Sequence, residues 1–241
     1  MSLPNVRQEE VSNVILSALP AREFAELAPH LERVSFAAGK TLYEVEDAAG
    51  RVYFIESGLL SLISTLEDGT YIEVAALGRE GVGGMLMLLG AEAAVHTALA
   101  QMAGEALCAR AERAREAFRR LPAFQSKALA YARMLFTNVT QVAACNTLHT
   151  VEERLARWLL MCRRRAGSGA LPLTQEVLSH MLGVRRSGVT VAVGILQQAG
   201  FVTHSRGQIV VTDPEGLRGV SCECINALEE AYDEFVAAKI V

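Results

Sequence analysis

The sequence predicts an α+β protein with a β-rich N-terminal unit, one long helix and a C-terminal winged helix-turn-helix, in that order. Three observations support this fold class. Short apolar runs fill residues 34–109, where ten of the 19 glycines lie between Gly39 and Gly104. An apolar helical pattern then runs from about 110 to 145. Residues 171–213 contain two short helical patterns followed by a hairpin pattern.

Composition limits the class of protein. The chain has 241 residues, of which 51% are hydrophobic and 21% charged, as in globular proteins. No apolar run approaches the ~20 residues of a membrane-spanning helix, and the first residues lack a signal-peptide pattern. We therefore expect a cytoplasmic protein with no membrane partner.

Charge is distributed unevenly along the chain. Residues 151–212 hold 8 Lys and Arg against 3 Asp and Glu, a net +5, whereas residues 213–241 hold 2 against 7, a net −5. Because phosphate contacts supply most nonspecific affinity for nucleic acid, a basic segment within an acidic chain favours a nucleic-acid partner.

The N-terminal unit begins with two predicted helices. Val11, Val14, Ile15 and Leu19 share a face of the first, and Pro20 opens the second. Strand-like runs follow at Thr41–Tyr43, Val52–Glu56, Leu59–Thr65, Tyr71–Ala76, Val95–Met102 and Glu105–Ala109. The segment Glu67–Thr70 predicts a hairpin turn, so we expect an antiparallel sandwich or barrel.

The long helical segment has a heptad pattern from Leu121 onward, with Pro122 as a first-turn residue. One series of positions is Leu121, Ala128, Leu135 and Val142, and the other is Gln125, Ala132, Val139 and Asn146. This pattern predicts a dimer seam formed by Leu121, Ala128, Ala132, Leu135, Val139 and Val142. A second face, with Leu129, Phe136 and Ala143, is expected to pack on the β-rich unit. A core helix in a monomer is the alternative interpretation.

The C-terminal part starts near Leu148, and Thr150–Glu153 forms a capping-box pattern. Thr174 can cap a helix with a buried face formed by Val177, Leu178, Met181 and Leu182, and Gly183 permits the tight turn that follows. A second helix, from about Arg186 to Ala199, would bury Val189, Val193 and Leu196 and end at Gly200. Strands at 201–203 and 208–212, joined by His204–Gly207, would form the wing.

In a winged helix-turn-helix, the N-terminal end of the second helix enters the major groove. That geometry places Arg185, Arg186 and Ser187 nearest the bases, where an arginine can bond both acceptors on a guanine edge. The candidate DNA-binding residues are Thr174, Gln175, Arg185, Arg186, Ser187, His204 and Arg206. A solvated surface pair is the alternative interpretation of the two adjacent arginines.

These motifs resemble the cyclic-AMP receptor protein/fumarate-nitrate regulator (Crp/Fnr) family. The stretch Leu171–Asp213 is the most specific part, and Gly50–Ile63 resembles the family's β-roll. The resemblance implies a cyclic-nucleotide-binding-like β-roll sensor domain with flanking helices (1–109), a dimerisation helix (110–147), a winged helix-turn-helix (148–213) and a C-terminal helical extension (214–241).

The resemblance also implies a homodimeric transcription regulator that binds a two-fold symmetric site in double-stranded DNA, with RNA polymerase as a further partner. Arg186 would be the principal base contact, and Arg185 would contact phosphate. Ser187 and Val191 occupy positions where the cyclic-AMP receptor has charged base-contacting residues. Its operator sequence therefore does not carry over.

The expected effector pocket comprises Gly83, Gly84, Met85, His96, Thr97 and Thr140. Cyclic-nucleotide members have a Gly-Glu pair followed by an Arg-Ser pair, but Met85 replaces the glutamate and no arginine lies in Val95–Thr97. The first cysteine is Cys108, so the N-terminal cysteines of iron–sulfur members are missing, and no motif supports haem. The effector stays unidentified, and a β-roll without a ligand is the alternative.

Of the five cysteines, only Cys222 and Cys224 form a close pair in the sequence. No second Cys/His pair lies nearby at zinc-site spacing, so we expect reduced thiols on a C-terminal helix and no metal.

Two other function classes are compatible with parts of the sequence. The chain could be a ligand-binding or scaffolding module whose winged domain contacts proteins, although the basic segment argues against this. An enzyme would need convergent catalytic groups, and the five histidines are isolated from carboxylate clusters. We therefore expect no catalytic residues.

Overall fold

The computed structural model describes residues 6–47, 50–167 and 169–238. Residues 6–30 contain the two predicted helices, α1 (Val14–Ser17) and α2 (Ala21–Leu27), flanked by the 3-10 turns η1 (Gln8–Glu10) and η2 (Ala28–His30). Asn13 caps α1 by accepting from the amides of Ile15 and Leu16, and Pro20 is the N-cap residue of α2.

The β-roll consists of two four-stranded antiparallel sheets. The first contains β1 (Glu32–Phe36), β8 (Gly104–Arg110), β3 (Arg51–Ile55) and β6 (Val82–Gly83), in that order. The second contains β2 (Thr41–Tyr43), β7 (Thr97–Met102), β4 (Leu59–Thr65) and β5 (Tyr71–Leu77). The six predicted runs are therefore confirmed, and Gly69, with φ of 82°, forms the β4–β5 turn. β1, β6 and the short helix α3 (Met85–Leu88) were not predicted.

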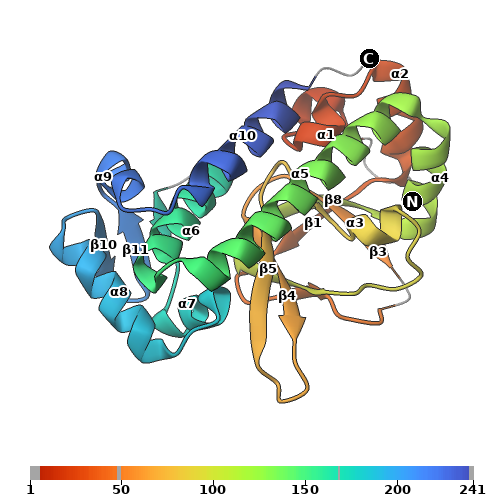
Figure 1. The fold of residues 1–241 in the computed structure, drawn as a ribbon. Helices are drawn as coiled ribbons and strands as arrows, with labels where there is room; N and C mark the ends of the chain where they lie inside the picture. Colours follow the sequence, from red (N-terminus) through yellow and green to blue (C-terminus); the bar gives the residue numbers. More distant parts are fainter. Residues whose placement is uncertain (1–5, 48–49, 168, 239–241) are drawn as a thin grey trace.

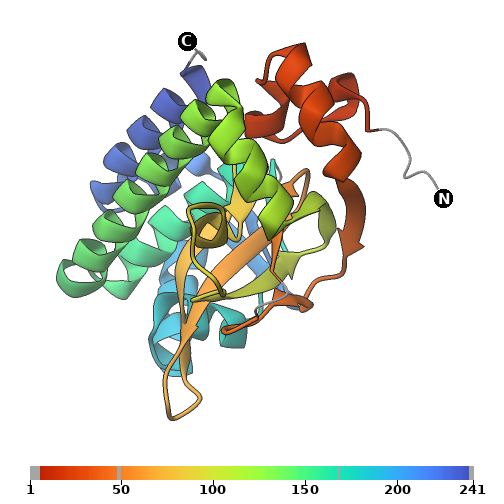
Figure 2. The same cartoon turned by 90° about the vertical axis from the view of Figure 1, so that its right-hand side faces the viewer.

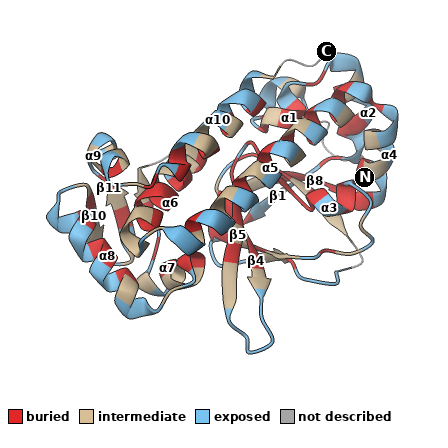
Figure 3. Ribbon diagram, in the orientation of Figure 1, coloured by how far each residue is buried: buried red, intermediate tan, exposed pale blue. Residues whose placement is uncertain are grey.

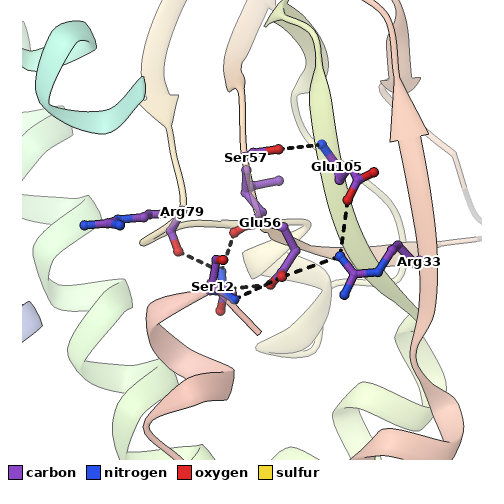
Figure 4. Close-up of polar contacts among 8 residues, drawn as sticks. Ser12, Arg33, Glu56, Ser57, Arg79 and Glu105 are labelled. Atoms are coloured by element: carbon purple, nitrogen blue, oxygen red, sulfur yellow. Dashed lines mark hydrogen bonds and ion pairs between the residues drawn. The ribbon is translucent and has the colours of Figure 1, made fainter. Parts of the chain in front are cut away.

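A buried polar junction fixes the N-terminal helices to the β-roll (Figure 4). The Glu56 carboxylate accepts from the backbone amides of Ser12 and Asn13, each over 3.0 Å, and lies 3.7 Å from Arg33. The Asn13 side-chain amide donates to the carbonyl oxygens of Arg79 and Gly81. Asn13 is fully buried, so this polar side chain is tolerated because its hydrogen bonds are made.

The long helical segment breaks at Leu121 into α4 (Ala111–Arg120) and α5 (Pro122–Leu148). α5 crosses the β-roll and lies side by side with α10 (Cys224–Ala237), which runs along its other side (Figures 1 and 2). Tyr131 of α5 packs edge-on against Phe235 of α10, and Lys127 donates to the Phe235 carbonyl over 2.7 Å. The C-terminal extension is thus helical, as predicted, and α10 packs on α5.

The C-terminal domain contains the predicted winged helix-turn-helix. Its elements are α6 (Val151–Ala166), β9 (Ala170–Leu171), α7 (Gln175–Leu182), α8 (Arg186–Gln198), β10 (Val202–Ser205), β11 (Gln208–Val211) and α9 (Pro214–Gly219). Thr150 and Glu153 form the capping box of α6. β9, β11 and β10 form a three-stranded antiparallel sheet, in which β9 was not predicted.

The C-terminal domain docks on the β4–β5 hairpin of the β-roll (Figure 1). Leu59, Ile63 and Ala76 of the hairpin belong to the same buried cluster as the core of the winged domain. Tyr71 packs against His180 with ring centroids 4.1 Å apart and the ring planes tilted by 37°. Two buried polar contacts reinforce the contact: Trp158 with Glu73, and Arg165 with Glu80, whose closest atoms are 2.9 Å apart.

Candidate DNA interface and effector pocket

The helix-turn-helix follows directly from local sequence chemistry. The Thr174 hydroxyl accepts from the Val177 amide over 3.1 Å and begins α7. Gly183 ends α7 with φ of 62°, a conformation that glycine adopts without a Cβ clash. Val189, Val193 and Leu196 hold α8 in the domain core, as predicted, and Gly200 follows α8 with φ of 82°.

The N-terminal end of α8 is exposed, so it could contact DNA. Arg185 is the N-cap residue, Arg186 begins the helix, and these residues and Ser187 are all exposed. Further along the same helix, Val191 and Ile195 are 59% and 48% exposed. α8 therefore presents two cations at its N-terminal end and apolar side chains beyond them, the pattern of a major-groove helix.

The remaining candidate DNA residues lie around α8. Thr174 and Gln175 are at the N-terminal end of α7, and the Gln175 side chain accepts from the Thr190 hydroxyl of α8 over 2.9 Å. Arg206, with φ of 49°, and Gly207, with φ of 76°, form the two-residue wing turn. His204 was predicted in this turn but lies in β10, paired with Ile209, and its Nε2 is buried. His204, like Gln175, is thus half-buried, whereas the other candidates are exposed.

A cavity of about 510 Å³ lies between the β-roll and α5. Gly84 and Met85 line one side, Val95 and His96 another, and Ala132, Leu135, Phe136 and Val139 of α5 complete the wall. Of the predicted pocket residues, Gly84, Met85 and His96 are therefore in place. Gly83 and Thr97 instead pair within the sheets, and the exposed Thr140 hydroxyl donates to carbonyl oxygens of its own helix.

The pocket offers no charge to an anion. Among the described residues that line it, Tyr43 and His96 are the titratable groups. Burial raises the pKa of Tyr43, whose hydroxyl accepts from the Gly84 amide over 2.8 Å, and burial lowers the pKa of His96. Both side chains therefore stay neutral at physiological pH, and a cyclic phosphate would find no cation here.

The predicted dimer seam needs correction. Leu121 and Ala128 are buried in the core of their own chain, because the first half of α5 packs on the β-roll and α4. Leu135 and Val142 are half-buried. The face expected to pack on the β-roll is instead exposed (Figure 3). This surface, termed the exposed α5 face, consists of the exposed Leu129, Phe136, Val139 and Ala143 and the half-buried Ala132.

This exposed α5 face has alternating three- and four-residue spacing, as in a heptad seam. Phe136 is 71% exposed and Leu129 48% exposed, whereas Ala132 and Val139 were already among the predicted seam residues. Residues advance about 100° per position on a helix, so this face lies roughly opposite the side that contacts α10. A partner helix could therefore pack on the exposed α5 face without displacing α10.

The cysteine pair in the C-terminal extension is not isolated, contrary to the sequence-based expectation. Cys222 and Cys224 lie beside Cys145 and His149 at the end of α5, and one ligand atom from each residue lies within 4.8 Å of the others. The expectation failed because the two pairs are separated by more than seventy residues in the sequence. Only the packing of α10 against α5 brings them together.

Comparison with known proteins agrees with both halves of the structure. Residues 33–121 match the family model of the cyclic nucleotide-binding domain, and residues 153–220 match that of the Crp-like helix-turn-helix domain. The Global nitrogen regulator of Synechocystis sp. is 26% identical over 211 residues, which cover 84% of this chain and 93% of that protein.

Solved structures share the fold over most of this chain. FixK2 from Bradyrhizobium japonicum has a TM-score of 0.67 at 20% identity, covering 80% of this chain and 98% of that one. A CRP/FNR-family transcriptional regulator from Thermus thermophilus has a TM-score of 0.61 at 23% identity, covering 79% and 98%. The fold and the α8 surface thus define a DNA-binding transcription regulator. The chain belongs to the Crp/Fnr family.

Proposed function

We propose that this regulator acts as a homodimer that binds a two-fold symmetric DNA site and responds to an apolar small molecule. The exposed α5 face is the observation that carries the proposal. Phe136 and Val139 belong to this face and also line the effector cavity. A partner helix packed here would cover the cavity mouth, so ligand binding and dimer geometry would be coupled.

The chemistry of the cavity wall supports an apolar ligand. Methyl, methylene and ring groups dominate it, and its titratable side chains, Tyr43 and His96, stay neutral. A volume of about 510 Å³ is within the range of pockets for drug-sized molecules. We expect cyclic AMP to bind far more weakly than an uncharged ligand of similar size, because its phosphate would lose water without gaining a cation.

Two recognition helices in such a dimer would enter successive major grooves, with half-site centres about 10 base pairs apart. The position of the site relative to a promoter would decide whether the dimer recruits RNA polymerase or excludes it. Among the described residues, no helix has the length and apolar character needed to span a bilayer. We place the protein in the cytoplasm because its DNA partner is there.

Selection of bound DNA from a random pool tests the DNA part of the proposal. We expect the selected sequences to contain an inverted repeat, and we expect the binding constant to fall steeply with salt concentration. Selected sequences without two-fold symmetry would contradict the homodimeric arrangement. Binding without salt dependence would instead favour protein contacts through the winged domain.

The effector part is tested separately by thermal unfolding in the presence of a library of uncharged small molecules, with cyclic AMP included. A cavity ligand should raise the unfolding temperature of the wild type, because it binds only the folded state. Ala132→Phe should abolish that shift by filling the cavity. A ligand that stabilises both proteins equally would bind elsewhere.

A further inference from the structure

We propose that Cys145, His149, Cys222 and Cys224 bind one Zn²⁺ ion. Neither the family models nor the effector pocket assigns these residues a role, and the site does not depend on DNA or on a partner subunit. Cys145 is in the last turn of α5, and His149 is the residue after the helix ends. Their spacing of four places them on one face. Cys222 and Cys224 come from the start of α10.

The distances fit tetrahedral coordination. The sulfur atoms of Cys145 and Cys222 are 3.4 Å apart, and the Cys224 sulfur is 3.6 Å from Nδ1 of His149. With zinc–sulfur bonds of about 2.3 Å and zinc–nitrogen bonds of about 2.0 Å, the edges of a tetrahedron are about 3.5–3.8 Å. These two pairs of ligand atoms therefore already lie at nearly the separation that the ion would impose, and all four atoms lie within 4.8 Å of one another.

The surroundings of the cluster resemble those of a structural zinc site. The other histidine nitrogen, Nε2, is 3.2 Å from the Glu223 carboxylate, as in the carboxylate–histidine–zinc arrangement that orients a ligand imidazole. The Gln141 amide donates to the Cys224 sulfur over 3.1 Å. The three cysteines are at most 2% exposed. Four protein ligands with little access for water are typical of a structural zinc site, whereas a catalytic site keeps one position open.

Charge provides an independent argument. Arg154 and Arg157 of α6 are 7% and 4% exposed, and both lie near Cys145. Within the described chain, their Nε atoms have no hydrogen-bond partner and neither side chain forms an ion pair with a carboxylate, although Arg154 donates to the Leu182 carbonyl and Arg157 lies near Glu73. Buried cations require a nearby anion. Zn²⁺ with three thiolates and a neutral imidazole carries a net charge of −1, and zinc binding would release the three thiol protons to solvent.

Zinc is the ion that this ligand set favours. Three soft thiolates and one imidazole in a closed tetrahedron suit Zn²⁺, whereas Mg²⁺ and Ca²⁺ require oxygen ligands. The ion would tie the end of α5 to the start of α10, directly beside the junction with α6. The packing of α10 on α5 would then depend on metal.

Metal analysis of the full-length protein, purified under reducing conditions and equilibrated with zinc chloride, tests the site. We expect about one zinc per chain in the wild type and in Cys108→Ser, a control for a buried cysteine outside the cluster, and little zinc in Cys224→Ser. Titration of the metal-free wild type with Co²⁺ should give thiolate-to-cobalt charge-transfer absorption and the intense visible bands of tetrahedral coordination. This measurement needs no variant to fold.

Glu223→Gln provides a second variant that should fold normally, because the Glu223 side chain is 79% exposed. We expect its zinc affinity, measured against a chromophoric chelator, to fall at least about 10-fold as the histidine loses its orienting carboxylate. A wild-type protein that binds no zinc or cobalt would overturn the proposal. So would a disulfide between Cys145 and Cys222 that persists when zinc is supplied under reducing conditions.

Discussion

The indole N–H of Trp158 in α6 donates to the carboxylate of Glu73 in β5 over 2.6 Å, within the interface between the β-roll and the DNA-binding domain. Ser61 of β4 donates to the same carboxylate. Burial nevertheless raises the pKa of Glu73, against the lowering effect of these hydrogen bonds. The orientation of the DNA-binding domain therefore depends on a carboxyl group that is costly to ionise.

Replacing Glu73 with Gln should remove a pH dependence of stability. Because the folded-state pKa is raised, the stabilising effect of the neutral carboxyl is complete below its ordinary value and is lost as pH rises through the raised value. Wild-type protein should lose unfolding free energy as the pH rises from acidic values, where the carboxyl is neutral, through and above its raised pKa, and Glu73→Gln should lose less. Chemical denaturation across this pH range measures the difference.

Glu67→Gln, at an exposed position in the β4–β5 turn, is the matched control and should follow the wild-type profile. A loss of more than about 1 kcal/mol in Glu73→Gln at pH 7 would mean that the ionised carboxylate stabilises the interface through Arg157 and Arg165.

Arg165→Ala should destabilise the protein by about 3–5 kcal/mol, because it leaves the fully buried Glu80 carboxylate without its cation. Urea denaturation measures the change. Arg164→Ala, which removes a more exposed partner of Asp233, should cost no more than about 1 kcal/mol. The double variant Glu80→Gln/Arg165→Met should recover part of the loss, and an unrecovered loss would show that packing, not charge, dominates at this position.

Arg186→Ala should reduce sequence discrimination, whereas Arg185→Ala should reduce affinity for any DNA. Arg186→Ala is expected to cost about 1–3 kcal/mol on the selected DNA site and less on scrambled DNA, since it removes a base contact. Arg185→Ala should weaken both complexes similarly and lower the salt slope by about one unit. Fluorescence anisotropy at several salt concentrations separates the two, with Arg113→Ala on α4 as a control for charge. Equal losses for Arg186→Ala on both DNAs would make it a phosphate contact.

Phe136→Asp should convert the dimer to a monomer, because it places a charge at the centre of the exposed α5 face. Light scattering after gel filtration reports the mass directly. Leu66→Asp introduces the same charge at an exposed leucine in the β4–β5 hairpin and should leave the mass unchanged. A dimer that survives Phe136→Asp would have to form through another surface.

Much of this fold could be predicted because its signals are local. Thr174, Gly183 and Gly200 mark the beginnings and ends of the two recognition-motif helices through backbone chemistry that involves only near neighbours. The β-strands at 59–65 and 41–43 were predicted at their observed bounds for the same reason. β6 and β9 were missed because each has two residues, and only pairing with distant strands defines them.

The features that could not be predicted from the sequence depend on tertiary packing. α5 has apolar residues on more than one face, so periodicity alone could not decide whether Leu121 or Phe136 is covered by the chain's own β-roll. The cysteine cluster likewise requires α10 to fold back along α5 before Cys222 can reach Cys145. Both features are properties of how helices are placed rather than of their own sequences.

α5 contributes one side to the β-roll and effector cavity, another to α10, and a third to the exposed face, and its end carries Cys145. Most of the circumference of this helix therefore contributes to a contact or a cavity. In a saturation mutagenesis screen scored by reporter expression, we expect α5 to tolerate fewer substitutions per residue than α4, whose outer surface is charged and exposed. Evolution of a new effector specificity would then proceed more readily through Met85, Val95 and His96 than through the helix that faces them.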